Sequence, residues 1–280
     1  MPGFFAPKSP QIGRVGDRGI ASLQLLGLRI DRIRLPELLN IVLHHVRQST
    51  RATVLYVNVH CMNVADDDAA YRRILQEADL VYCDGTGVRL GAWLSGQHLP
   101  QRMTGADWID SLCRLATRER LTLFFIGGAP GAAIDAARVL QDRYKGLKIA
   151  GVRSGYDIAP DVIEDINRSC ADIVLVGMGT PRQEKWIATH RNQLQAPVVW
   201  AVGALFDFAS GRIPRGPRWM TNHGLEWLCR LAAEPRKLWR RYLIGNPLFL
   251  WRIVRHYWRP RRLLRKEHRS SDALPGEKND

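Results

Sequence analysis

The chain has 280 residues, enough for one large α/β domain with an appendage or for two small domains. With 46% hydrophobic and 24% charged residues it has the composition of a folded protein, which excludes disorder of the whole chain. The net charge is +14, and residues 236–269 alone hold twelve Lys and Arg against the single acid Glu267. This distribution predicts that a polyanion or an anionic surface meets the C-terminal segment rather than the nearly neutral body.

Along most of the chain, short apolar runs alternate with segments of helical periodicity. The expected strands are LQLLGLRI, TVLYVNV, LVYCD, LTLFFIGG, LKIAGV, DIVLVGMG and APVVWAVGAL. The expected helices cover residues 36–47, 69–77, 105–117, 131–144, 161–169 and 182–192. This alternation predicts an α/β fold with a Rossmann-like, mostly parallel sheet and helices on both faces.

The organisation predicted around this sheet has four parts. Residues 1–20 form a flexible N-terminal lead-in, residues 21–213 the α/β domain, residues 214–268 a basic amphipathic helical appendage, and residues 269–280 a disordered tail. Five widely spaced cysteines without a C-x-x-C pair, and the lack of an apolar run long enough to span a bilayer, predict a cytoplasmic protein.

A parallel sheet binds ligands beyond the carboxyl ends of its strands, so the loops that follow the strands are the candidate site. In IGGAPG, Gly127 and Gly128 precede a helix whose first amides suit a phosphate or a ribose. The spacing is not G-x-G-x-x-G, however, and a plain turn explains it equally well.

Asp84 follows an apolar strand and is followed by Gly85, which lets a ligand approach the backbone. A partly shielded carboxylate at this place can act as a general base toward a hydroxyl, and an Asx turn is the equally good alternative. After Gly179, Gln183 is expected in the first turn of a helix, facing the crevice and bonding sugar hydroxyls, while Glu184 complements the helix dipole.

The triplet Asp66 to Asp68 has two interpretations. It is similar to the D-x-D of metal-dependent sugar-nucleotide enzymes, but it also introduces a helix, and we favour the helix cap. His60, the pair His44 and His45, and Cys83 are interpreted as structural. We therefore expect no metal and no other cofactor.

Taken together, the strand-end segments resemble the WecG/TagA/CpsF family of bacterial glycosyltransferases, glycosyltransferase family 26, over roughly residues 26–242. Eight motifs in one order carry the resemblance: VNVHCMN, ADLVYCDGTGV, RMTGADW, FFIGGAPG, GYD, VGMGTPRQEKW, VGALFDFASGRIPRGPRWM and GLEWLCRLAAEPRKLWRR. The resemblance implies an inverting, metal-independent enzyme that moves a hexose or N-acetylhexosamine, of N-acetylmannosamine type or glucose, from a UDP-sugar. The acceptor would be a polyprenyl-diphosphate-linked sugar in cell-surface polysaccharide biosynthesis.

The resemblance also implies roles for individual residues. The base of the family's D-G motif falls on Asp84. The family's T-x-N falls on Tyr56, Val57 and Asn58, with Tyr56 in place of the threonine, and its active-site glutamine falls on Gln183.

The family's three C-terminal arginines fall on Arg230, Lys237 and Arg240. Lys237 lacks the bidentate fork of an arginine, so neighbouring Arg236 is expected to share its role. In the hypothesised mechanism, Asp84 deprotonates the acceptor hydroxyl. The three cations, expected on one face of a continuous helix, stabilise the departing UDP. Arg241 and Arg252 have a plainer explanation as part of a solvated basic face.

The C-terminal segment predicts a second role. Leu250, Trp251, Val254, Tyr257 and Trp258 recur at helical spacing with arginines between them, which is typical of an interfacial helix. We expect peripheral attachment to the anionic inner face of the cell membrane, with a homo-oligomer interface as the alternative. A basic nucleic-acid-binding α/β protein is the competing function, but it leaves the strand-end loops unexplained, so no nucleic-acid partner is expected. A nicotinamide-dependent dehydrogenase is a third and weaker candidate function.

Overall fold

The computed structural model describes residues 19–155 and 161–257, so most of the predicted lead-in and all of the predicted tail lie outside the described residues. Six parallel strands form one sheet in the order β4-β3-β8-β7-β5-β6. They are β3 (Ala52–Val57), β4 (Leu80–Cys83), β5 (Thr122–Gly127), β6 (Lys148–Arg153), β7 (Ile173–Gly177) and β8 (Val198–Ala201). The predicted α/β class with a Rossmann-like parallel sheet is confirmed.

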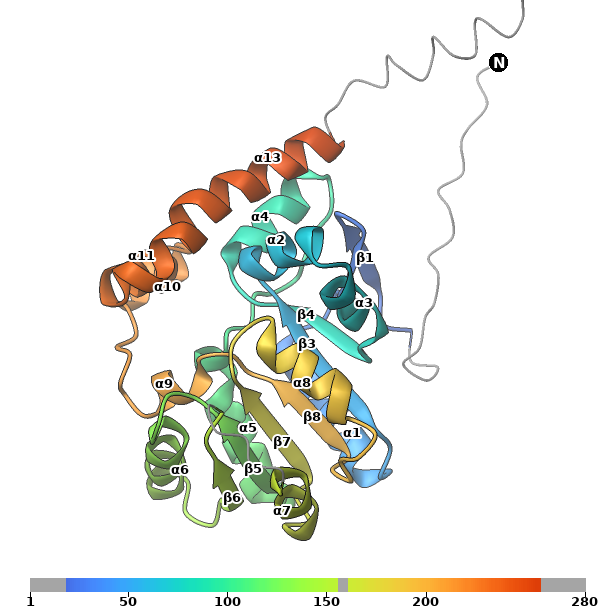
Figure 1. Cartoon of the computed structure of the whole chain (residues 1–280), viewed down its shortest axis with the longest axis vertical. Helices are drawn as coiled ribbons and strands as arrows, with labels where there is room; N and C mark the ends of the chain where they lie inside the picture. Colours follow the sequence, from blue (N-terminus) through green and yellow to red (C-terminus); the bar gives the residue numbers. More distant parts are fainter. Residues whose placement is uncertain (1–18, 156–160, 258–280) are drawn as a thin grey trace, which may run out of the picture.

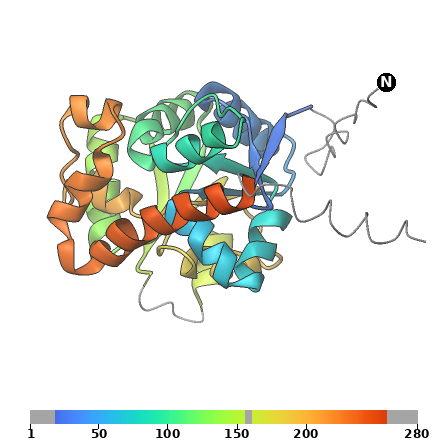
Figure 2. The ribbon, with the colours of Figure 1, turned by 90° about the horizontal axis from the view of Figure 1, so that it is seen from above.

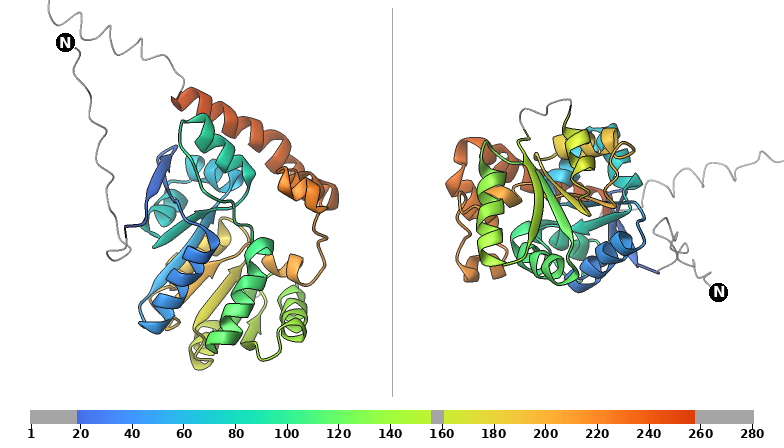
Figure 3. Two further views of the ribbon diagram at one scale, coloured as in Figure 1. Left: turned by 180° about the vertical axis from the view of Figure 1, so that it is seen from behind. Right: turned by 90° about the horizontal axis from the view of Figure 1, so that it is seen from below.

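Helices cover both faces of this sheet (Figures 1 and 3). On one face lie α1 (Leu35–Arg47) and α5 (Gly105–Glu119); on the other lie α3 (Ala69–Glu77), α7 (Val162–Arg168) and α8 (Arg182–His190). A further helix, α6 (Ala132–Arg143), packs beside β5 and β6. The central strands β7 and β8 are buried along their whole length, which is why they are continuous apolar runs.

Aromatic packing fixes the centre of the sheet. Trp108 of α5 stacks on Trp200 of β8 with ring centroids 4.2 Å apart. The indole Nε1 of Trp200 donates to Tyr82 Oη at 3.2 Å, so the polar atoms of these two rings are paired inside the core. Trp200 and Tyr82 lie in β8 and β4, two of the strands whose carboxyl ends were predicted to form the ligand site.

The N-terminal run LQLLGLRI was expected to be one strand and is instead a hairpin. It folds into β1 (Ser22–Leu25) and β2 (Leu28–Asp31), which form a separate two-stranded antiparallel sheet. Leu26 and Gly27 both have positive φ, 51° and 78°, as a two-residue type I′ turn requires. Glycine alone marks this turn in the sequence, and the apolar Leu26 conceals it.

Two helices occupy segments that were expected to be loops. They are α2 (Val59–Asp67) and α4 (Thr86–Leu94), and each begins within three residues of a strand end. Their start signals, Asn58 and Gly85, were interpreted as ligand-binding residues rather than as helix boundaries. Asn58 is the N-cap of α2, and its side chain accepts from Cys61 N at 3.1 Å.

After α9 (Leu205–Ala209), the chain forms a run of helices. They are α10 (Arg218–Asn222), α11 (Glu226–Ala233), α12 (Pro235–Trp239), the π-helical turn η1 (Arg240–Ile244) and α13 (Gly245–Tyr257). The last of them runs back across the end of the sheet over α2 and α4 (Figure 2). Phe249 packs so closely on Gly91 of α4 that a Cβ there would lie 2.6 Å from its ring.

Arg252 ties α13 to α2 and does not belong to a solvated basic face. Its Nη1 donates to Asn63 Oδ1 at 2.8 Å, and its Nη2 lies 2.9 Å from Asp66 and 3.0 Å from Asp67. The third acid, Asp68, accepts from Tyr71 N at 2.9 Å as the N-cap of α3, so the predicted cap is confirmed. Asp66 and Asp67 therefore fix α13 against α2, and Asp68 begins α3.

Arg252→Ala is expected to lower the free energy of unfolding by about 1–2 kcal/mol, because it removes a hydrogen bond to the buried Asn63 amide as well as two solvent-screened ion pairs. Urea unfolding measures this loss, and hydrogen exchange of the α13 amides shows whether the helix opens locally. Arg255→Ala is the matched control, since Arg255 is exposed, lies over the Trp251 ring and makes no hydrogen bond or ion pair with the described residues. Equal stability of the two variants would contradict the role of Arg252.

Candidate active site

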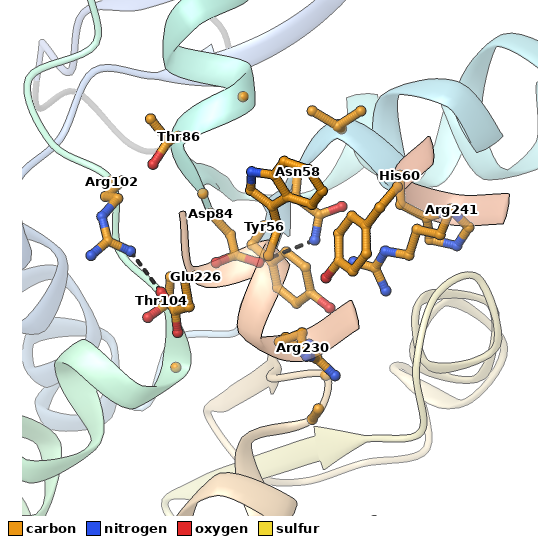
Figure 4. Close-up of a pocket in the computed structure, with 18 of the residues that line it drawn as sticks. Tyr56, Asn58, His60, Asp84, Thr86, Arg102, Thr104, Glu226, Arg230 and Arg241 are labelled. Atoms are coloured by element: carbon orange, nitrogen blue, oxygen red, sulfur yellow. Dashed lines mark hydrogen bonds and ion pairs between the residues drawn. The ribbon is translucent and has the colours of Figure 1, made fainter. Parts of the chain in front are cut away.

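A cavity of about 560 Å³ opens beyond the carboxyl ends of β3, β4, β7 and β8, under the C-terminal helices. Figure 4 shows Tyr56, Asn58 and Asp84 at its centre, with Arg102 and Glu226 on one flank and His60 and Arg241 on the other. The sheet and the C-terminal helices both contribute to its wall. Of the candidate residues predicted from the sequence, those that line it are Tyr56, Asn58, Asp84, Gly85, Gly179, Arg230 and Lys237.

Asn58 orients the carboxylate of Asp84. Asn58 Nδ2 donates to Asp84 Oδ2 at 3.1 Å, while its Oδ1 accepts from Cys61 N as the cap of α2. Because the helix cap requires the oxygen, the amide has only its nitrogen left to turn toward Asp84. The backbone N–H of Asp84 in turn donates to Val57 O at 2.8 Å, which holds the ends of β3 and β4 in register.

The environment of Asp84 makes it more basic than an ordinary aspartate. Burial raises its pKa to about 6, although the Asn58 hydrogen bond and the positive charge of Arg241 oppose the rise. The negative charge of nearby Glu226 adds to it. Asp84 is therefore ionised at neutral pH, and it accepts a proton more readily than an aspartate with an ordinary pKa, as a general base requires.

Gln183 lies in the first turn of α8 as predicted, but it does not face the cavity. It is fully buried, and its Nε2 donates to Tyr56 Oη at 3.1 Å and to Glu184 Oε1 at 2.8 Å. Its Oε1 accepts from Gly203 N at 3.0 Å. Since the Tyr56 oxygen is already an acceptor, its own proton remains available for donation. Gln183 acts here on the position of Tyr56.

Glu184 lies in the first turn of α8, where the sequence predicted it, and is equally buried. Its Oε1 accepts from Thr180 Oγ1 at 2.8 Å, and its Oε2 is buried without a hydrogen-bond partner. Burial raises the pKa of this carboxyl, which favours its neutral form. Glu184 thus belongs to the support beneath Tyr56 rather than to the cavity surface.

The cations of the C-terminal segment do not share one helix face. The helix breaks between Ala233 and Pro235 and continues through the π-helical turn η1. The prediction that these residues share one face of a continuous helix is therefore wrong. Arg230 and Lys237 line the cavity, whereas Arg236 and Arg240 are exposed and do not. Arg241, interpreted from sequence as a solvated residue, lines it instead.

Several cavity residues were not singled out from the sequence: His60 was considered structural, and Arg102, Thr104 and Glu226 lay unremarked within the motifs RMTGADW and GLEWL. Arg102 Nη1 donates to Glu226 Oε2 at 3.0 Å, which joins the body to α11. Burial and the charge of Arg241 lower the pKa of His60 to about 4, so His60 is neutral at physiological pH.

The glycines of IGGAPG lie away from the cavity wall. A Cβ on Gly127 would come within 2.3 Å of Gly177 O, so this residue is required by the close approach of β5 and β7. Gly128 does not line the cavity either, which leaves the plain-turn explanation for this motif. In the part of the chain that the structure describes, no three His, Cys, Asp or Glu side chains gather as metal ligands would.

Comparison with known proteins shows which family the chain matches. The profile described as "Glycosyl transferase WecG/TagA/CpsF family" matches residues 23–263. A Staphylococcus aureus (strain NCTC 8325 / PS 47) protein, N-acetylglucosaminyldiphosphoundecaprenol N-acetyl-beta-D-mannosaminyltransferase, is 28% identical over 239 residues, or 84% of this chain and 93% of that protein. The protein of the same name from strain MRSA252 is 27% identical over 238 residues, again 84% of this chain and 93% of its own length.

Proposed function

Since this chain belongs to the WecG/TagA/CpsF family of glycosyl transferases, we propose that it moves a hexose or N-acetylhexosamine, of N-acetylmannosamine type or glucose, from a UDP-sugar to a polyprenyl-diphosphate-linked sugar. The names of the relatives support the acceptor and an N-acetylmannosamine donor. The observation that carries the proposal is one cavity holding both a basic carboxylate and a group of cations.

The chemistry is a single displacement. Asp84 accepts the proton of the acceptor hydroxyl while that oxygen forms a bond to the anomeric carbon. The bond from the anomeric carbon to the diphosphate oxygen breaks on the opposite face, so the configuration inverts and UDP leaves with the electron pair. Arg230 and Lys237 supply positive charge toward the leaving diphosphate, a role that needs no metal ion.

The test is incubation with a panel of UDP-sugars and a short-chain polyprenyl-diphosphate sugar, with and without EDTA, read by mass spectrometry. One added hexose or N-acetylhexosamine, unaffected by EDTA and of inverted anomeric configuration by NMR, is the expected product. No transfer from any UDP-sugar would reject the proposal; transfer that requires a divalent ion or retains configuration would reject the mechanism. Family membership already favours an enzyme over the nucleic-acid-binding alternative.

We also propose that the C-terminal helices attach the protein peripherally to the anionic inner face of the cell membrane. Of the helices within the described ranges, none has both the length and the hydropathy needed to span a bilayer. Large exposed apolar side chains of the described residues lie, except for Ile134, on α4 and the C-terminal helices: Leu90, Trp93, Trp219, Leu228, Trp239, Leu243, Ile244, Trp251 and Val254. Arginines stack on two of them, Arg240 on Trp239 and Arg255 on Trp251, as at a lipid interface.

The exposed face of α13 differs from the one expected from sequence. Leu250 lines the cavity, and Tyr257 is held by the body, donating to Gln24 O at 3.1 Å. Trp251 and Val254 remain exposed, at 53% and 50%. Trp258 lies outside the described residues. The surface offered to lipid is therefore narrower on α13 and is extended by α4.

Replacing Trp93 and Trp251 together by Glu is expected to abolish sedimentation with anionic vesicles at moderate salt, because two interfacial aromatics are lost and two repulsive charges are gained. Ile134→Glu is the matched control, since Ile134 is also exposed but lies on α6, and it is expected to sediment like the original protein. If the original protein fails to sediment and the double variant instead dissociates an oligomer in solution, the surface is a subunit interface.

A further inference from the structure

The cavity carries more positive than negative charge. Among the described residues, four cations line it, Arg102, Arg230, Lys237 and Arg241, against the carboxyl groups of Asp84 and Glu226. A site with this excess suits a dianionic or trianionic group such as a diphosphate. The cation that binds such a group most directly is expected to be the one without an acid partner.

Three of the four are matched by acids of the described chain. Arg102 donates to Glu226 at 3.0 Å, and Lys237 lies 3.0 Å from Glu234 Oε1. Arg230 lies 3.7 Å from Glu234 Oε2, with its guanidinium over the Phe208 ring. An anionic ligand must compete with these carboxylates or share the cations with them.

Arg241 differs from the other three. Within the described residues its guanidinium makes no hydrogen bond and no ion pair, and it lies over the Tyr242 ring at 5.6 Å. Its Nε is buried without an acceptor, as is the Nε of Arg230, but Arg230 also has the Glu234 carboxylate at 3.7 Å. A buried guanidinium donor without a partner is costly, and a ligand that accepts from it removes that cost. Arg240, beside it in the sequence, is exposed and lies over the Trp239 ring.

We propose that Arg241, rather than Arg240, is the residue of the C-terminal helices that binds the diphosphate of the nucleotide donor directly. This inference rests on the proposed function and names the diphosphate contact within it. The π-helical turn η1 explains the shift by one position, because its wider turn rotates the residues at 240 and 241 relative to a regular α-helix.

Because Arg241 and Asp84 line the same cavity, the charge of Arg241 has a further effect. As the bond to the diphosphate breaks, negative charge grows on the leaving oxygen, and a guanidinium that already lines the cavity, with its Nε buried, stabilises that charge. The charge of Arg241 acts on Asp84 and on His60, and it lowers the pKa of both groups. One arginine thus meets the leaving group and keeps the base ionised.

The test compares Arg241→Gln with Arg240→Gln by calorimetric titration of the full chain with UDP and, separately, with uridine. Arg241→Gln is expected to weaken UDP binding about 10- to 100-fold, the loss of a charge-assisted hydrogen bond, and to leave uridine binding unchanged. Arg241→Lys keeps the charge without the fork and is expected to recover part of the loss. Arg255→Gln, on the exposed side of α13, controls for net charge.

The outcomes separate the two proposals. If the original chain binds neither UDP nor a UDP-sugar, the proposed function fails, whatever the variants do. If the original chain binds UDP but Arg241→Gln binds it equally well, or Arg240→Gln or Arg255→Gln weakens it as much, the assignment of Arg241 is overturned and the function stands. Thermal melting confirms folding, since Arg241 has no ion pair to a described residue whose loss would destabilise the chain.

Discussion

Asp84→Asn is expected to reduce sugar transfer about 100- to 10,000-fold, the usual contribution of a general base. The asparagine keeps the shape of the side chain and can still accept from Asn58 Nδ2, but it cannot take the proton of the acceptor hydroxyl. Because the diphosphate contacts are on other residues, UDP affinity is expected to stay close to that of the original chain. Initial rates with the preferred UDP-sugar and calorimetric titration with UDP measure the two effects.

The same substitution is expected to stabilise the protein. Burial raises the pKa of Asp84 from 3.8 to about 6, so the folded protein holds this proton more tightly than the unfolded chain, and ionisation costs folding free energy. The cost is absent below about pH 4, grows up to about pH 6 and is complete above it. Asp84→Asn removes the cost and should raise the free energy of unfolding by about 2 kcal/mol at pH 7.5, with no gain at pH 4.

Asp135→Asn is the matched control for both measurements. Asp135 is partly exposed on α6 and pairs with Arg212 at 2.6 Å, so its replacement is expected to change neither transfer nor the pH dependence of stability by much. Less than a tenfold loss of transfer in Asp84→Asn, at saturating donor and acceptor, would contradict the assignment of Asp84 as the general base. A stability gain that persists unchanged at pH 4 would show that the carboxylate is not strained by burial.

The carboxyl ends of the strands were predictable because apolar runs mark buried parallel strands directly. Asp84 and Asn58 follow such runs, and both lie in the cavity. The packing direction of a helix-borne residue is harder to infer from one chain. Gln183 was placed in the correct turn, yet a polar residue there can face either solvent or a buried partner, and Tyr56 is that partner.

The C-terminal cations illustrate a second limit. The spacing of Arg230, Lys237 and Arg240 predicts one shared face only for a regular helix, and the break at Pro235 and the π-helical turn change the rotation of each later residue. Which arginine enters the cavity depends on where α13 docks, and that is decided by contacts nearly 200 residues away, such as Arg252 with Asn63. No local pattern encodes this docking.

Asn58→Asp is expected to move the pH dependence of transfer without unfolding the site. Aspartate caps a helix as well as asparagine does, so the bond from Cys61 N and the start of α2 are retained. The substitution places a second carboxyl about 3 Å from Asp84, where the amide nitrogen now donates at 3.1 Å. Two carboxylates this close cannot both ionise readily, so one proton is held to higher pH.

In the original chain, kcat/KM is expected to rise with pH through about 6, as Asp84 loses its proton, and then to level off. In Asn58→Asp the rise should shift upward by about 1–2 pH units, so transfer at pH 6.5 falls roughly tenfold or more and recovers at pH 9. Asn58→Ser keeps a capping oxygen, removes the amide donor and adds no charge, so its shift should be smaller. An unshifted profile in Asn58→Asp, in a protein that melts normally, would mean that the group controlling the rate is not the carboxyl beside residue 58.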